Sequence, residues 1–164
     1  MIVGEGPGRQ EDLCGRPFVG RAGRLLDELL AHAGLRRKEV YITNIVKHRA
    51  AMNTASDNDR PPRSDEIAAC RPWLEAQVQI IQPRIIVTLG RLALAAFLPL
   101  ATIGECHGRA QRAAGRTILP LYHPSYALHN PRVRPVLFRD MRALKRLAAL
   151  GREAARATIG LDSH

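Results

Sequence analysis

The sequence predicts an α/β protein, a three-layer α/β/α sandwich around a mostly parallel sheet of four strands. Short segments rich in β-formers alternate along the chain with segments of helical periodicity, which is typical of parallel strands joined by crossover helices. Residues 84–89 form a short apolar run, as expected of a strand that is covered on both faces. The chain has 164 residues, a length that fits one domain with its own core. We expect this domain at 1–157 and a flexible tail at 158–164.

In the first half of the chain we expect two strands, a helix and a long loop. Residues 1–3 are the end of a buried strand that runs into a glycine-rich turn at 4–8. Leucines at helical spacing, followed by a glycine, predict a helix over about 21–33. Residues 40–44 are rich in β-formers and predict a strand. The polar segment at about 47–63 is the long loop.

The second half repeats the alternation of helix and strand. A serine followed by acidic residues begins a predicted helix over 64–82, which ends before a proline. The strand at 84–89 follows, and a glycine then opens a helix over about 90–98. Another strand is expected at 116–120, and a long basic helix at about 132–155.

Polar segments follow three of the predicted strands, at 5–12, 44–48 and 123–126. In parallel α/β sheets, ligands bind outside the carboxyl ends of the strands, so we expect these segments to converge on one site. The third segment begins with His123. Because Pro124 restricts the residue before it, His123 cannot lie within a regular helix and is expected on a turn.

The chain is strongly basic, since 25 lysines and arginines against 15 acidic residues give a formal net charge of +10. Such a charge favours association with a polyanion, and nucleic acid is the first partner that it indicates. A basic surface without a specific partner remains the alternative, because net charge describes association rather than chemistry.

The cysteines and the apolar segments indicate a cellular compartment. Cys14, Cys70 and Cys106 are odd in number and widely spaced, which argues against a disulfide framework and fits a reducing cytoplasm. No run of 18 apolar residues predicts a membrane span, and Met1 leads directly into an apolar strand rather than a basic leader. We therefore expect a soluble cytoplasmic monomer without a membrane partner.

Short motifs of nucleotide and hydrolase sites are incomplete or missing in the sequence. The turn GEGPG at 4–8 is followed by Arg9, where the dinucleotide fingerprint needs a third glycine. No GK[ST] phosphate loop, GxSxG elbow or HExxH zinc site occurs. A nucleotide-binding protein without a role on DNA is therefore disfavoured.

Four segments, in order along the chain, carry a more specific pattern. They are GEGPGRQED at 4–12, GRPFVGRAG at 15–23, YITNIVK at 41–47 and HPSY at 123–126. Together they resemble the motifs of the uracil-DNA glycosylase superfamily, closest to family 4 and to the related family X, and the resemblance extends from Val3 to about residue 147. It implies an enzyme of base excision repair that flips a deoxyuridine out of DNA, hydrolyses its N-glycosidic bond, releases uracil and leaves an abasic site.

An everted base needs a stacking plate, an edge reader and a group that stabilises it as it departs. Phe18 is expected to stack on the uracil ring, with an ordinary core position as the alternative. Asn44 is expected to read O4 and N3 of uracil, where cytosine reverses donor and acceptor, with a turn-closing asparagine as the alternative. Gly6 and Pro7 are expected to line the same pocket.

The resemblance implies that His123 donates a hydrogen bond to O2 of uracil as negative charge develops there. The residues after it are expected to press into the minor groove, with Leu128 as an apolar wedge. Where the family pattern often has arginine after this leucine, the chain has His129. The predicted DNA contacts are Ser125, Tyr126, Leu128, His129, Lys47, Arg49 and Arg60.

Water activation is expected from a carboxylate near the glycine-rich turn. The position after Glu5 is acidic in the best-known glycosylase family and glutamine in family X, but here it is Gly6. We therefore expect Glu11 to orient water or to sense C5 of the base, with Glu5 as a second catalytic carboxylate. Asp12 is better explained as a charge at a helix N-terminus. A module that binds uracil-containing or damaged DNA with little or no catalysis is the alternative that Gly6 motivates.

Family 4 and family X carry an iron-sulfur cluster on four cysteines, two of them upstream of the first residue of this chain. Cys70 matches one remaining position, and His48 stands at the other. We therefore expect no cluster and no other cofactor, and a zinc site at these two residues lacks further ligands. Family X also traps the abasic sugar on a histidine in a basic loop. The corresponding loop at 52–62 has no histidine, so no covalent product is expected.

Overall fold

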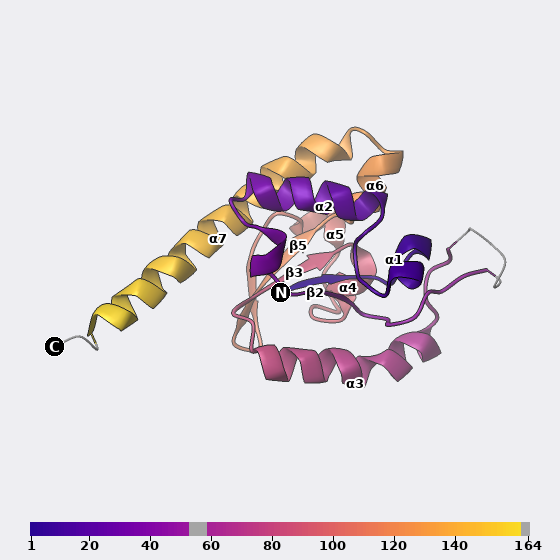
Figure 1. Ribbon diagram of the computed structural model, residues 1–164, viewed down its shortest axis with the longest axis horizontal. Helices are drawn as coiled ribbons and strands as arrows, with labels where there is room; N and C mark the ends of the chain where they lie inside the picture. Colours follow the sequence, from indigo (N-terminus) through magenta and orange to yellow (C-terminus); the bar gives the residue numbers. More distant parts are fainter. Residues whose placement is uncertain (53–58, 162–164) are drawn as a thin grey trace.

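The computed structural model describes residues 1–52 and 59–161, with side chains up to Gly151 (Figure 1). Its sheet has the strand order β2-β1-β3-β5-β4. The strands are β1 Ile2–Gly4, β2 Ile42–Asn44, β3 Ile85–Leu89, β4 Gln111–Ala113 and β5 Arg116–Leu121. The first four in spatial order run parallel, and β4 runs antiparallel to β5. The predicted α/β class with a mostly parallel sheet is confirmed, but the sheet has five strands rather than four.

The additional strand is β4, which the sequence did not reveal. Its residues, glutamine, arginine and alanine, show neither apolar alternation nor strong β-formers. The strand forms because the chain turns back sharply at Ala114 and Gly115, whose φ angles of 47° and 75° are both positive. Ala113 then pairs directly with Arg116. Two-residue turns with positive φ match the twist of a hairpin, so the turn places β4 at the sheet edge.

Helices cover both faces of the sheet (Figure 1). On one face lie α2 Arg21–His32, α6 Pro124–His129 and α7 Val133–Leu161; on the other lie α3 Ser64–Ile81 and α4 Arg91–Ala95. The shorter elements are α1 Arg9–Cys14, the 3-10 helix η1 Arg37–Glu39 and α5 Ile103–Cys106. The four helices predicted from periodicity and end signals are confirmed as α2, α3, α4 and α7, with boundaries that differ by a few residues.

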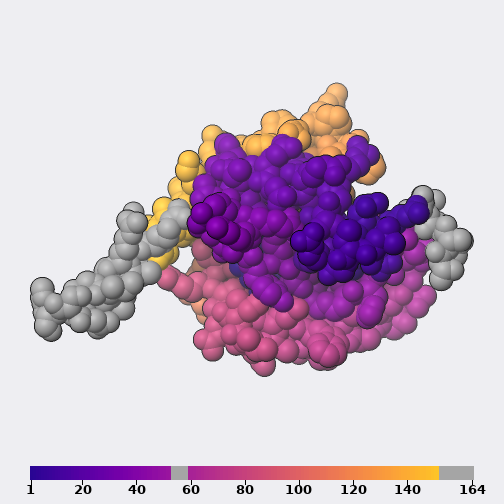
Figure 2. Space-filling view, viewed as in Figure 1, coloured from indigo at the N-terminus to yellow at the C-terminus, as the bar shows by residue number. Residues whose placement is uncertain are grey.

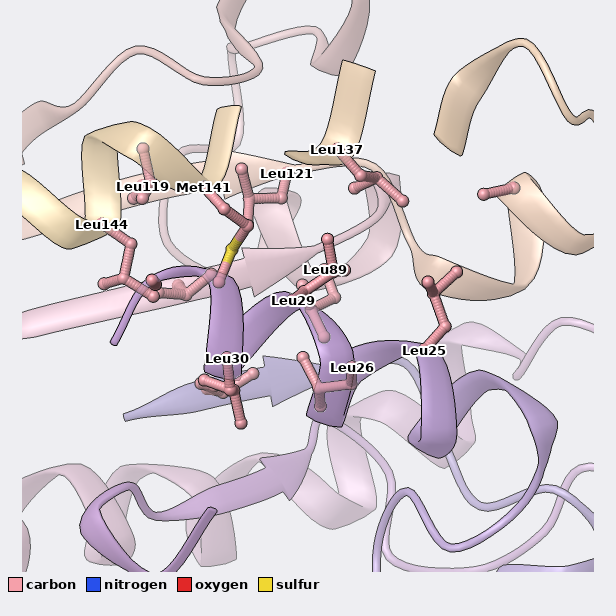
Figure 3. Packing of buried hydrophobic residues seen from close by; sticks show 14 of the residues in the cluster. Leu25, Leu26, Leu29, Leu30, Leu89, Leu119, Leu121, Leu137, Met141 and Leu144 are labelled. Atoms are coloured by element: carbon pink, nitrogen blue, oxygen red, sulfur yellow. The ribbon is translucent and has the colours of Figure 1, made fainter. Parts of the chain in front are cut away.

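Alternate residues of the central strands supply two apolar clusters, one on each face. Leu119 and Leu121 of β5 pack with the leucines of α2 and with α7, whereas Ile118 packs on the α3 side. Figure 3 shows the first cluster, in which Leu29 and Met141 approach the strands from two different helices. Successive side chains of a strand point to opposite faces, so this period of two produces the three layers.

The expected turn at His123 is replaced by the short helix α6. His123 has extended backbone angles and is the N-cap residue, so it lies outside the regular helix as the sequence required. Pro124 occupies the first helical position, where the N–H that proline lacks would have no partner within the helix. The histidine is therefore fixed by a helix start rather than by an isolated turn.

At the carboxyl end, α7 continues to Leu161. Residues 162–164 lie outside the described residues, so the expected tail at 158–164 stays a prediction. The same holds for residues 53–58 of the expected long loop. Within the described ranges, no helix combines the length and the apolar character that crossing a membrane requires.

Candidate active site

A cavity of about 440 Å³ opens at the carboxyl ends of the parallel strands. The segment at 5–11 after β1 forms one wall, and the segment at 18–22 that leads into α2 forms another. Val46 and part of the segment at 50–62 come from the chain after β2, and His123 with Ser125 follows β5. In Figures 1 and 2 the segment that carries α1 lies between the α2 layer and the α3 layer. The segments after β1 and β5 therefore meet here, whereas the segment at 44–48 contributes only Val46 to this cavity.

His123 lies at this cavity with a defined proton position. Its Nδ1 accepts a hydrogen bond from the backbone N–H of Ser125 at 3.1 Å, and Ser125 Oγ is 2.6 Å from the same nitrogen. Because Nδ1 is an acceptor, the proton of the neutral ring belongs on Nε2. Burial lowers the pKa of His123 to about 4, and the charge of Glu11 only partly opposes this shift. At neutral pH the imidazole is uncharged and has one N–H to donate.

Phe18 lines the same cavity and contacts His123. The two ring centroids are 5.6 Å apart, with the planes tilted by 33°. Phe18 has a φ of 54°, an uncommon angle for a residue other than glycine, and is 5% exposed. A Cβ on Gly23 would lie 1.9 Å from the carbonyl oxygen of Phe18, so only glycine lets α2 approach this backbone. The sequence predicted either a stacking plate or an ordinary core residue. Phe18 belongs to the apolar core and also lines the cavity.

Glu11 fastens the backbone that carries Phe18. Its Oε1 accepts hydrogen bonds from the backbone N–H groups of Val19 at 2.8 Å and Gly20 at 2.7 Å. Gly20 is the N-cap residue of α2, so the carboxylate also lies at the positive end of that helix. Glu11 lines the cavity, as expected of a residue that orients water, but one of its oxygens serves the fold.

Asn44 is buried beside Phe18 rather than in the wall of the main cavity. It is 5% exposed, and its Oδ1 has no hydrogen-bond partner. A Cβ on Gly4 would lie 2.5 Å from Asn44 Oδ1 and 2.6 Å from the Phe18 ring, so both side chains meet over this glycine. Asn44 lines a neighbouring cavity of about 270 Å³. The two cavities share Pro7, Glu11 and Val46 as walls.

The main cavity has two further carboxylates. Glu5 lines it, and burial raises the pKa of this carboxyl, while the charge of Arg91 opposes the shift. Asp59 also lines it and pairs with Arg49 Nε at 2.6 Å. The sequence did not single out Asp59, because its proximity depends on the path of the segment at 50–62. Gly6 packs so closely that a Cβ there would lie 2.7 Å from Val46 Cγ2, which gives a steric reason for its missing side chain.

The predicted DNA contacts on α6 differ in exposure. Ser125 lines the main cavity, and Tyr126 and His129 are exposed. Leu128, the expected wedge, is partly buried and packs against the apolar cluster of α2 and α7. Of this set, Tyr126, which is 47% exposed, and His129 are therefore the side chains that present surface to a partner.

The three predicted phosphate contacts outside α6 all have partners within the chain. Lys47 donates to three oxygen acceptors, Arg49 pairs with Asp59, and Arg60 pairs with both carboxylate oxygens of Glu66 at 2.6 and 2.8 Å. Glu66 in turn caps α3 by accepting from the N–H of Arg63. Arg60 also lines the main cavity, whereas Lys47 lines the neighbouring cavity and its ammonium bonds to acceptors of the chain.

The described residues do not fit an iron-sulfur cluster. Cys70 is buried and accepts a hydrogen bond from the backbone N–H of Lys47 at 3.3 Å. Cys14 is exposed on α1, and Cys106 is buried on α5. Within residues 1–52 and 59–151, no three histidine, cysteine, aspartate or glutamate side chains gather as metal ligands.

Comparisons with known proteins show which family the chain resembles. Residues 1–149 match the family model described as the uracil DNA glycosylase superfamily. The type-4 uracil-DNA glycosylase of Sulfurisphaera tokodaii is 41% identical over 160 residues, which cover 90% of this chain and 69% of that protein. The type-4 enzyme of Thermotoga maritima is 46% identical over 133 residues, 79% of this chain and 66% of that protein.

A third similar protein is much longer than the two type-4 enzymes and is named as a polymerase. The DNA polymerase of Bacillus phage SP01 is 31% identical over 148 residues, which cover 90% of this chain but only 15% of the polymerase. The chain thus spans about two thirds of the length of the two type-4 enzymes and a small part of this polymerase. The match to the family model over nearly the whole length shows that the chain belongs to the uracil DNA glycosylase superfamily.

Proposed function

We propose that this chain is a monofunctional uracil-DNA glycosylase, which hydrolyses the N-glycosidic bond of a flipped-out deoxyuridine, releases uracil and leaves an abasic site in base excision repair. Family membership supports the reaction class, because the type-4 relatives are named for this activity. The single observation that carries the proposal is the position of His123, whose Nδ1 accepts from Ser125 and which lines a cavity together with Phe18.

The departing base defines the task of His123. As the bond between C1′ and N1 breaks, negative charge develops on the uracil ring and positive charge on the sugar. A preorganised N–H aimed at O2 stabilises the ring charge without having to reorganise during the reaction. A neutral imidazole suits this role, because its N–H donates a hydrogen bond to the oxygen and the proton stays on the ring. Ser125 supports it by holding Nδ1 as the acceptor.

Phe18 and Asn44 would recognise the base. Stacking on an aromatic plate favours any base by about 1 to 3 kcal/mol, so Phe18 supplies affinity rather than discrimination. Asn44 can supply the discrimination, because its Oδ1 accepts from N3–H of uracil while its Nδ2 donates to O4. The unpaired, buried Oδ1 is a polar group that gains a partner on substrate binding. This oxygen and the Phe18 ring both lie over Gly4, so the stacking plate and the edge reader are neighbours.

The hydrolysis needs one water molecule, whose oxygen binds C1′ while its proton passes to a carboxylate. Glu11 and Glu5 are the predicted candidates, and both line the main cavity. Glu5 retains its proton more readily than an exposed glutamate, because burial raises its pKa. Glu11 has Oε1 engaged by two backbone N–H groups, which orients Oε2 for a water molecule. We assign the water to Glu11 and a supporting role to Glu5.

Duplex DNA would bind across the mouth of the cavity. The net charge of +10 favours the phosphate backbone, and the exposed side chains of Arg9 and Arg21 line the cavity. Gly6 and Pro7 would border the base, and Ser125, Tyr126 and His129 would face the strand, whereas Leu128 packs against the apolar cluster. Binding should weaken steeply as salt is raised, because phosphate contacts release condensed counterions. Three free cysteines support a reducing compartment, so we propose a cytoplasmic monomer.

The test is a direct assay of the reaction. The protein is incubated with a uracil-containing oligonucleotide, and abasic sites are then cleaved with alkali. We expect strand cleavage that depends on uracil, and no protein band that remains attached to DNA in denaturant. Tight binding of the same oligonucleotide without cleavage would favour the binding module instead, and absence of both would overturn the proposal.

A further inference from the structure

Lys47 makes a set of contacts that a phosphate-binding lysine does not make. Its Nζ lies 2.7 Å from the carbonyl oxygen of Asn44, 2.8 Å from Oε1 of Gln77 and 2.9 Å from Oγ1 of Thr43. An ammonium group has three protons, so these acceptors use its full capacity. Burial lowers the pKa of Lys47, which agrees with an ammonium that is partly removed from water.

The contacts tie the end of one strand to the helix that covers it. Thr43 and Asn44 are the last residues of β2, and Gln77 lies on α3. Thr43 also donates to Gln77 Oε1 at 3.1 Å, so the three acceptors form one network around the ammonium. β2 is an edge strand of the sheet and has only β1 as a neighbouring strand. At the end of β2, the ammonium of Lys47 donates a hydrogen bond to the carbonyl oxygen of Asn44.

The side chain of Asn44 has little else to hold it. Its Oδ1 accepts no hydrogen bond, so its orientation depends on packing against Gly4 and Phe18 and on the position of its backbone. Lys47 fixes that backbone through the carbonyl oxygen of the same residue. A misplacement of about 1 Å in a positioned group can cost about a hundredfold in rate, so this tie has a catalytic consequence.

We propose that Lys47 is a positioning residue, which holds Asn44 in register for the pyrimidine edge and does not contact phosphate. The proposal rests on the proposed function, because the register of Asn44 matters only if Asn44 reads a base. It replaces the sequence-based expectation that Lys47 binds DNA, which considered only its charge and its place after a strand. The geometry of three acceptors at 2.7 to 2.9 Å is what separates the two roles.

The test compares Lys47→Met, Lys47→Arg and the control Lys38→Met. Lys38 is exposed on η1 and lines neither cavity, so it matches the loss of charge alone. Single-turnover uracil release is measured at saturating protein, and DNA affinity is measured over a series of salt concentrations. We expect Lys47→Met to slow uracil release by about tenfold or more, with a DNA affinity and salt slope like those of Lys38→Met.

Two further variants separate positioning from charge and from folding. Lys47→Arg keeps the charge, but a planar guanidinium does not fit three acceptors arranged around an ammonium, so the rate should not recover. In the Asn44→Ala background, Lys47→Met should cause little additional loss, because its effect passes through Asn44. Gln77→Met removes one of the three acceptors of Lys47. It should lower the rate of uracil release less than Lys47→Met does, while thermal unfolding stays close to wild type.

Opposite results overturn the proposal. An unchanged single-turnover rate with weaker DNA binding and a smaller salt slope would return Lys47 to the phosphate role. An equal rate loss in the wild-type and Asn44→Ala backgrounds would show a general structural effect. Wild-type protein that releases no uracil would remove the proposed function itself, and the inference with it.

Discussion

The two faces of the sheet hold their parts of the site by different means. On the α2, α6 and α7 face, Phe18 belongs to a large apolar cluster, and His123 is fixed by the start of a helix. On the α3 face, the ammonium of Lys47 links the backbone carbonyl of Asn44, at the end of an edge strand, to Gln77. Apolar packing is insensitive to pH and salt, whereas a partly buried ammonium depends on its partners. The first face thus provides a rigid support, and the second a polar network that has to be complete.

The largest effect on the apolar face should come from His123→Ala. It removes the donor to O2, and loss of one such preorganised donor typically lowers the rate by about 10² to 10³. Single-turnover uracil release checks this, with His32→Ala on the exposed side of α2 as the control. A His123→Ala protein that retains full activity would show that the oxygen is stabilised from elsewhere.

Phe18→Leu sharpens the comparison, because it keeps an apolar side chain in the cluster and removes the aromatic plate. The expected loss is about 1 to 3 kcal/mol in binding the everted base, or up to about a hundredfold in affinity. The matched control is Phe138→Leu on α7, where the ring contacts His32 away from the cavity. Equal effects of the two changes on uracil-DNA binding would assign Phe18 to the core alone.

Gly4→Ala tests the packing of Asn44 and Phe18 over this glycine. The added methyl group would lie 2.5 Å from Asn44 Oδ1 and 2.6 Å from Phe18, and such crowding costs about 1 to 3 kcal/mol. Gly104→Ala on α5 meets no atom within 4 Å and should leave thermal unfolding nearly unchanged. A Gly4→Ala protein as stable and as active as wild type would indicate a looser contact between Asn44 and Phe18.

The smallest effect concerns pH. Because the folded-state pKa of His123 is lowered to about 4 from its usual value of 6.5, the unfolded chain binds more protons between these values. The contribution of the neutral ring to the free energy of unfolding is therefore complete above pH 6.5 and is lost as the pH falls toward 4. Histidine ¹⁵N NMR should show a neutral ring with its proton on Nε2 at pH 5.5. Titration of His123 near its usual value would contradict the burial of this ring.

Much of the fold followed from local patterns. The leucine stripe of α2, the apolar run of β3 and the glycine before α4 are each visible within a few residues. β4 was missed because its pairing depends on the turn at Ala114 and Gly115 rather than on its own side chains. The turn expected at His123 became α6, since Pro124 fits the first position of a helix as well as it fits a turn.

The site was only partly visible for a physical reason. His123 and Phe18 were expected at the site from their resemblance to family motifs, and the parallel topology brings both to one edge of the sheet. The inward position of Lys47 was not visible, because its acceptor Gln77 is 30 positions away on another element. The same holds for Asp59, whose place in the cavity depends on the fold of the segment before α3. Charge predicts which side chains prefer water, but it does not predict which of them form hydrogen bonds within the folded protein.

The central claim is that Phe18, Asn44 and His123 surround one pyrimidine ring. A crystal structure of the protein with uracil bound tests it most directly. We expect the ring stacked on Phe18, with His123 Nε2 and the Asn44 amide each within about 3.2 Å of a polar atom of the base. A uracil bound in the main cavity out of hydrogen-bonding reach of the Asn44 amide would contradict the account.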